Sequence, residues 1–122
     1  MLLEPIEKIR LVKSDTPQAF ETAEEAWFWF INAMQARHDG ARIVAGLGRA
    51  LRPCEPVDIY KAIDRLYRTR RLLIDHLKVM RHYGMRGVRP DHTRIREALS
   101  AKLWDEAMDR LAQSLKLKGI IS

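Results

Sequence analysis

Residues 56–83 read PVDIYKAIDRLYRTRRLLIDHLKVMRHY, and their periodicity decides the fold class of the chain. Apolar side chains return every three or four positions, which places them on one side of a helix that turns 100° per residue. The first stripe contains Ile59, Ala62, Ile63, Leu66 and Tyr67. The second contains Leu72, Leu73, His76, Leu77, Val79, Met80 and Tyr83. The pattern predicts two amphipathic helices, at residues 56–68 and 72–83, joined by a tight turn at residues 69–71.

A longer helix is predicted on either side of this unit. The earlier one begins at Thr16 and Pro17, because Thr caps free backbone amides and Pro suits the first helical position. It ends near Gly40, and its apolar stripe contains Phe20, Ala23, Trp27, Phe30, Ile31 and Met34. The last helix covers residues 93–116, with Asp91 or Thr93 as its cap. Its apolar seam contains Ile95, Leu99, Leu103, Ala107, Leu111 and Leu115, widened by Trp104 and Met108.

The remaining segments give weaker signals. Residues 1–14 read as an N-terminal arm, and residues 41–54 have helical spacing that Gly46 and Gly48 interrupt. The tail at Ile120 and Ile121 is expected to form a short strand, which could pair with residues 8–13. We therefore expect residues 1–122 to form one all-α domain, a helical bundle of four to five helices. It contains a helix-turn-helix-like pair at 56–83 and a minimal two-strand contact between the termini.

The composition agrees with a chain of this kind and restricts where it resides. Hydrophobic residues make up 47% of the 122 residues, enough for one core of ordinary domain size. Cys54 is the single cysteine and cannot form an intramolecular disulfide. The longest uncharged run, residues 26–36, falls well short of the ~20 residues that a transmembrane helix needs. With no signal-peptide pattern at the start, the expected location is cytoplasmic, without a membrane partner.

Positive charge is concentrated in the middle of the chain. Residues 35–96 carry fifteen Lys or Arg against six Asp or Glu, for a net charge of +9 within a total of +6. An excess of this size attracts polyanions, nucleic acid above all. The alternative is that a GC-rich genome has raised the Arg content, since fifteen of the 22 basic residues are Arg.

The leading functional hypothesis combines this charge with the paired helices. A helix-turn-helix places its second helix in the major groove, where base edges offer distinctive donors and acceptors. Lys78, Arg81 and His82 would face the groove. The phosphate contacts would come from Arg68, Arg70, Arg71, Arg86 and Arg89. The alternative is that these charges only keep an outer helix face in contact with solvent. In addition, the turn lacks the Gly that is common in helix-turn-helix motifs.

No residue pattern predicts catalysis, a metal or a cofactor. The four His residues contain no His-x-x-x-His pair, and one Cys cannot support a four-ligand zinc site. His76 is expected at the edge of the core with its hydrogen bond satisfied. Cys54 lies near Arg52, but flanking prolines and the lack of a base favour an inert thiol over a nucleophile. The glycines at 46 and 48 only weakly resemble a phosphate-binding loop. We expect a non-enzymatic protein.

The second hypothesis is a helical adaptor that binds another protein, for instance an acidic one. Phe28, Trp29 and Trp104 lie at or beyond the edges of helical stripes, and aromatic side chains are enriched where partners dock. The apolar arm and tail would suit a homodimer with a second copy of the chain. For each aromatic the alternative is a core position buried on two sides, and this is the favoured interpretation for Trp27 and Trp104.

Overall fold

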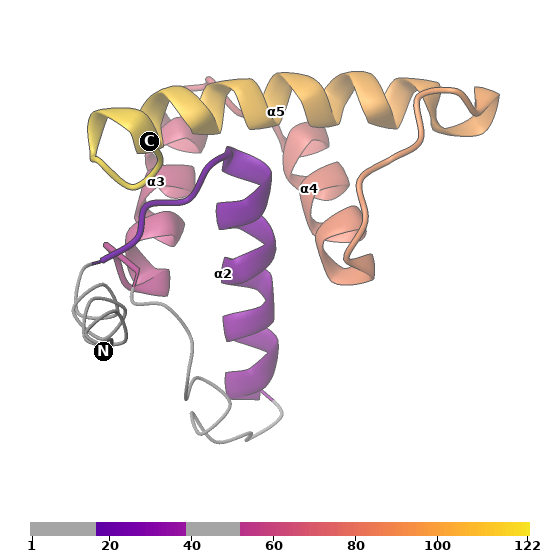
Figure 1. Cartoon of the computed structure of the whole chain (residues 1–122). Helices are drawn as coiled ribbons and strands as arrows, with labels where there is room; N and C mark the ends of the chain where they lie inside the picture. Colours follow the sequence, from indigo (N-terminus) through magenta and orange to yellow (C-terminus); the bar gives the residue numbers. More distant parts are fainter. Residues whose placement is uncertain (1–16, 39–51) are drawn as a thin grey trace, which may run out of the picture.

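The computed structural model describes residues 17–38 and 52–122, and these form an all-α structure. Its helices are α2 (Ala23–His38), α3 (Pro56–Arg68), α4 (Ile74–Arg86) and α5 (Ala98–Leu117), with a short 3-10 helix, η2 (Ile95–Glu97), before α5. Helices α2, α3 and α4 extend from the same side of α5, which crosses one end of all three (Figure 1). The all-α prediction is confirmed for the described residues. None of their helices has the length and apolar character needed to cross a membrane.

Helix α2 begins later than the sequence analysis predicted, at Ala23 instead of Thr16 and Pro17. Thr22 is its N-terminal cap, because the Thr22 Oγ1 accepts a hydrogen bond from the backbone N–H of Glu25 at 3.1 Å. The carboxylate of Glu25 reaches back to accept the N–H of Glu21 at 2.7 Å. Thr-x-x-Glu is a known start signal for helices, and here it takes precedence over the earlier Thr-Pro. The predicted end agrees with the structure, since α2 ends at His38.

Phe20 lies just before α2 in extended backbone, where it pairs with the C-terminal tail. Phe20 and Ile121 form an isolated parallel β-bridge. The Phe20 N–H donates to Ile120 O and the Ser122 N–H donates to Phe20 O, both at 3.0 Å. Residues 8–13, which the sequence analysis suggested as the partner of the tail, lie outside the described residues, as do the arm at 1–14 and the glycines at 46 and 48.

The bounds of α3 match the prediction, whereas α4 is displaced along the chain. A helix was expected at residues 72–83, but α4 runs from Ile74 to Arg86, and Gly84 lies inside it and is buried. The helix ends instead at Gly87, which has a left-handed φ of 78° that suits a residue without a Cβ. Gly84 serves packing, because a Cβ there would lie 2.7 Å from the Trp27 Nε1. Trp27 can therefore approach α4 closely and donate to Met80 O at 3.0 Å.

The last helix also starts differently from its prediction. Asp91 accepts hydrogen bonds from the backbone and hydroxyl of Thr93, and η2 precedes α5. Ile95 and Leu99 are 93% and 68% exposed, so the first part of the predicted seam is not buried. The reason is tertiary: the N-terminal end of α5 projects past α4, where no other described helix covers it (Figure 1). Ala107, Leu111 and Leu115 of the predicted seam are buried as expected.

The core lies where α5 meets the other three helices, and Trp104 is at its centre. Trp104 is fully buried, its ring contacts Phe28 at 5.7 Å and Tyr83 at 6.4 Å between centroids, and its Nε1 donates to Glu24. Burying a side chain of this size is among the largest single contributions to stability, and its replacement by Ala typically costs about 3–5 kcal/mol. One apolar cluster connects this residue to buried positions of all four helices and of the tail.

The helix-turn-helix interpretation of residues 56–83 is not confirmed. Helices α3 and α4 are joined by a short turn, but each packs on α5 and on α2, and they do not pack closely against one another. In a helix-turn-helix the two helices form a compact unit that presents the second one to the major groove. The structure therefore gives less support than the sequence for the hypothesis that α4 reads base edges in the major groove. The positive charge of this region does not depend on how the two helices pack.

Candidate nucleic-acid-binding surface

The segment with the most positive charge is α3, the following turn and α4. Residues 56–86 carry eight Lys or Arg and three Asp, for a net charge of +5 (8 − 3). The remaining described segments are closer to balance; α5, for example, carries three basic and three acidic residues. The eight positions predicted to contact nucleic acid divide into an α4 group, a turn group and Arg89, which the structure places in different environments.

The α4 group faces solvent. Lys78, Arg81 and His82 are exposed on the side of the helix opposite His76 and Met80, which are buried. The arc predicted from helical periodicity therefore agrees with the structure. Arg86 lies at the end of the same helix, where its guanidinium carbon is 5.6 Å from the centroid of the Tyr83 ring. This contact leaves the charge of Arg86 available, because a ring face attracts a cation without neutralising it.

The turn group is exposed but differs in its partners. The Arg68 Nε lies 3.0 Å from the Asp64 carboxylate, an exposed pair one helical turn apart. Arg70 has a φ of 66°, in the left-handed region that favours Gly, and its side chain is exposed. The Arg71 guanidinium donates to Gln113 of α5 at 2.8 Å, so this side chain is directed toward α5.

Arg89 is held within the structure. Its guanidinium lies 2.6 Å from Asp105 and 3.3 Å from Glu24, which joins the segment after α4 to α5 and α2. The same Glu24 carboxylate accepts the Trp104 indole N–H at 2.6 Å. Two carboxylates thus neutralise Arg89, and we leave it out of the proposed binding surface. The acidic partners lie about 15 and 65 positions away in the sequence, so no local pattern indicated them.

A polar network around the buried His76 joins the turn and the start of α4 to α5. His76 is 2% exposed; its Nδ1 accepts the Leu73 N–H at 3.0 Å and its Nε2 lies 2.9 Å from the Glu106 carboxylate. Because Nδ1 accepts, the proton resides on Nε2 and is donated to Glu106. This hydrogen bond lowers the pKa of Glu106. Arg110 donates to the backbone oxygen of Arg71 at 3.2 Å.

A satisfied hydrogen bond was expected at His76, and the structure shows two. The partners on α5 were not predicted. Glu106, Arg110 and Gln113 follow one another at spacings of four and three residues, which places them on one polar side of that helix. The spacing was present in the sequence, but a polar stripe does not reveal that it faces another helix. These three residues orient the turn that carries Arg70 and Arg71.

Cys54 has none of the properties of a nucleophile. Burial, reinforced by the carboxylates of Asp58 and Glu55, raises the pKa of its thiol to about 11. The nearby Arg52 acts in the opposite direction but is the smallest of these effects. At neutral pH the thiol is therefore protonated, whereas catalysis and metal binding need the thiolate. Within residues 17–38 and 52–122, no three His, Cys, Asp or Glu side chains form a cluster suited to a metal ion.

The aromatic side chains that suggested a docking patch are part of the core or packed against it. Trp104 is fully buried and Trp27 is 6% exposed, in agreement with the favoured interpretation. Phe28 and Trp29 are partly buried and pack against the core, Trp29 with its ring 5.2 Å from that of Phe20. Phe28, Trp29 and Trp104 therefore form no exposed aromatic surface, and they do not support the adaptor hypothesis. Ile120 and Ile121, suggested for a homodimer, are also buried within the chain.

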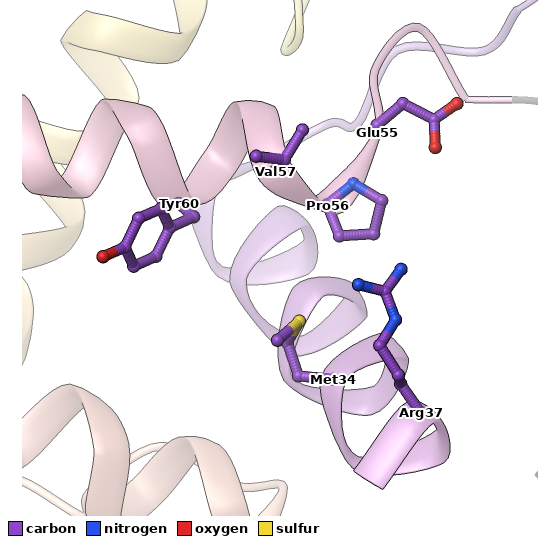
Figure 2. A pocket seen from close by; sticks show the side chains of 6 residues that line it. All are labelled: Met34, Arg37, Glu55, Pro56, Val57 and Tyr60. Carbon is purple, nitrogen blue, oxygen red and sulfur yellow. The ribbon is translucent and has the colours of Figure 1, made fainter. Parts of the chain in front are cut away.

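An open groove of about 450 Å³ lies between the end of α2 and the start of α3 (Figure 2). Its described walls are Met34, Arg37, Glu55, Pro56, Val57 and Tyr60. Tyr60 is 58% exposed. Sequence reasoning missed this site, because Met34 was assigned to the core stripe of its helix and Tyr60 was not considered.

No protein-family model, curated protein or solved structure matches the chain.

Proposed function

We propose that this protein is a non-enzymatic nucleic-acid-binding protein, a small helical module that contacts the phosphate backbone. The contact is made by what we term the basic surface, formed by Arg70, Lys78, Arg81, His82 and Arg86. One observation carries the proposal: within residues 17–38 and 52–122, these five side chains are exposed and make no ion pair with a carboxylate.

Four other cations of the described residues, Arg52, Arg68, Arg89 and Arg94, lie within 4.0 Å of a carboxylate. Others in this part of the chain, such as Arg96 and Lys102, also have no carboxylate partner, so the basic surface is distinguished by its five side chains lying together on α4 and the preceding turn. A run of unpaired positive charge on one helix and its preceding turn repels itself, which is a cost unless an anionic partner compensates. A nucleic acid provides such a partner, and each phosphate that is neutralised releases condensed counterions. Arg contributes most, because its planar fork matches two phosphate oxygens.

A helical adaptor that binds an acidic protein is the second candidate. The observation in its favour is the pair Ile95 and Leu99, which are 93% and 68% exposed where α5 projects from the other helices. Exposed apolar side chains one helical turn apart are common at protein contacts. Binding of a polyanion does not require these two apolar side chains. Replacing them therefore distinguishes protein binding from nucleic-acid binding.

The test is fluorescence anisotropy of labelled duplex and single-stranded oligonucleotides of mixed sequence, titrated with the full chain at about 50 and 200 mM salt. One variant, Arg70→Ala/Lys78→Ala/Arg81→Ala, removes three charges from the basic surface. The matched control, Arg94→Ala/Arg96→Ala/Lys102→Ala, removes three exposed charges near the start of α5. Both variants have the same net charge, so a difference between their affinities shows that the position of the charges matters.

We expect salt-sensitive binding that the surface variant weakens far more than the control. Each lost phosphate contact lowers the slope of log affinity against log salt by roughly one, so the surface variant should lose two to three units. Equal weakening by both variants would show attraction by net charge alone and would refute the basic surface. If neither oligonucleotide binds at low salt, nucleic-acid binding is refuted, and binding of acidic proteins with Ile95→Ser/Leu99→Ser becomes the next test.

A further inference from the structure

Two exposed tyrosines lie on one line along α3. Tyr60 and Tyr67 are 58% and 46% exposed. Seven residues turn a helix by 700°, only 20° short of two full turns, so both side chains leave α3 in nearly the same direction. They are separated by about 10.5 Å along the helix axis, at 1.5 Å per residue. An exposed aromatic ring is costly to leave in water, and two aligned rings form a surface that a planar ligand can cover.

The first of these rings borders the groove between α2 and α3. Figure 2 shows the Tyr60 ring and the Met34 side chain on either side of an open space, with the Arg37 side chain beside Pro56. A volume of about 450 Å³ is within the range of sites that hold a small aromatic group. Its walls combine apolar surface from Met34 and Tyr60 with the exposed charges of Arg37 and Glu55. This is suitable for a planar, polar-edged ring.

The charge beside the tyrosines favours an anionic chain. Lys61 is next to Tyr60 and is exposed, and Arg70 follows Tyr67 in the turn. The one acid between the two rings is Asp64, whose carboxylate is paired with Arg68 at 3.0 Å. Helix α3 and the following turn together carry five Lys or Arg against two Asp, and they lead directly into the basic surface at Arg70.

We propose that α3 binds single-stranded nucleic acid, with one base stacked on Tyr60 at the groove and another on Tyr67, while Lys61 and Arg70 contact the backbone between and beyond them. This inference rests on the proposed function and names its ligand class. A separation of about 10.5 Å corresponds to roughly three nucleotides of a stacked strand, which rises 3.4 Å per nucleotide. The two rings would thus hold bases that are close in sequence but not adjacent.

A duplex does not fit this site. In a double helix the faces of each base are covered by its neighbours, so a tyrosine ring cannot stack on them. A single strand exposes the base faces, and stacking on aromatic side chains beside a cationic track is how sequence-tolerant single-strand binders work. Because the 2′-hydroxyl plays no part in stacking, DNA and RNA share the chemistry that the tyrosines recognise.

The experiment compares single-stranded DNA, single-stranded RNA and duplex DNA of one sequence in the anisotropy assay. Tyr60→Ala/Tyr67→Ala removes both rings, and Tyr60→Phe/Tyr67→Phe retains them without the hydroxyl groups. The matched control is Ile95→Ala/Leu99→Ala, which removes two exposed apolar side chains from a distant site. All four positions are exposed, so folding should be retained, and thermal unfolding verifies this for each variant.

We expect the alanine pair to weaken single-strand binding at least tenfold, while the phenylalanine pair and the control change it less than threefold. Duplex binding by the alanine pair should be unchanged. Irradiation of a strand that contains 5-bromouracil should crosslink it to the peptides that carry Tyr60 or Tyr67. Single-strand binding that is unaffected by the alanine pair, but lost in the variant at Arg70, Lys78 and Arg81, would overturn this inference and leave the proposed function intact.

Two other results also overturn the inference. Equal loss in the alanine and phenylalanine pairs would show that the hydroxyl groups, not stacking, are responsible. Crosslinks confined to α4 would place the bases elsewhere. A chain that binds no oligonucleotide refutes the proposed function and this inference together. A chain that binds oligonucleotides through Arg70, Lys78 and Arg81, with binding unchanged in the alanine pair, refutes this inference alone.

Discussion

Gly84 provides the sharpest test of the packing described above. It lies inside α4, on the side of that helix against which the indole of Trp27 packs. A Cβ at position 84 would lie 2.7 Å from Trp27 Nε1 and 3.1 Å from Ile31 Cγ1. Trp27 is 6% exposed, stacked on Phe30, and tied to Met80 O by its indole N–H. A ring held in this way has little room to move, so Gly84→Ala must push α2 and α4 apart.

Two opposing effects determine the magnitude. Ala is favoured over Gly inside a helix by about 1 kcal/mol, which would stabilise the variant. Overpacking costs about 1–3 kcal/mol, and loss of the indole hydrogen bond adds about 0.5–1.5 kcal/mol. The unfavourable terms are larger, so we expect Gly84→Ala to lower the free energy of unfolding by about 2 kcal/mol. At roughly 4 °C per kcal/mol for a chain of this size, Tm should fall by about 8 °C.

The measurement is urea unfolding followed by far-UV circular dichroism, with thermal unfolding alongside. Trp27→Phe provides the partner variant, because Phe lacks the five-membered ring of the indole, whose Nε1 and Cε2 atoms the new Cβ would meet. Gly84→Ala should cost less in the Trp27→Phe background than in the wild type, which is a coupling that a double-mutant cycle measures. If Gly84→Ala is as stable as the wild type or more stable, helix propensity dominates and the close contact is refuted.

Two further predictions follow from the pKa shifts. Because burial raises the pKa of the Cys54 thiol to about 11, iodoacetamide should modify the native protein at neutral pH roughly tenfold more slowly than the urea-unfolded chain; the roughly hundredfold lower thiolate fraction is partly offset by the greater nucleophilicity of a more basic thiolate. Equal rates in the two states would contradict the burial of this thiol. The hydrogen bond from His76 lowers the pKa of Glu106, so this carboxylate stabilises the folded state above the ordinary Glu pKa of about 4.3 and loses that effect as the pH falls through its lower folded-state pKa. Glu106→Gln should therefore show a weaker loss of stability between about pH 5 and 3 than the wild type, measured by urea unfolding at each pH, and identical pH profiles would rule this contribution out.

Local periodicity predicted a large part of the fold. The bounds of α3, the end of α2 and the solvent-facing arc of α4 with Lys78, Arg81 and His82 all follow from residues within a few turns of one another. The start of α2 is also indicated by a local pattern, the Thr-x-x-Glu that begins at Thr22. Thr16 and Pro17 form a second possible helix start nearby. The pairing of Phe20 with the tail decided between the two, and that contact joins residues about 100 positions apart.

The candidate sites were less accessible to sequence reasoning. Arg70 and Arg89 look alike in the sequence, yet one is exposed in the turn and the other is neutralised by Glu24 and Asp105. The groove beside Tyr60 depends on how the ends of α2 and α3 are arranged. Neither the groove nor the two carboxylates near Arg89 leaves a periodic signal, because both bring together residues from separate elements.

The sequence by itself thus determined which segments are helical, which side of each helix is apolar, and where positive charge accumulates. These properties depend on neighbours in the chain, within the 3.6-residue period of a helix. Tertiary structure alone decided that Ile95 and Leu99 are exposed although they continue a buried seam, that Gly84 is a packing site for Trp27, and which cations remain without a carboxylate. Burial and pairing depend on where one element ends relative to another, and an apolar stripe does not specify how far its partner helix extends.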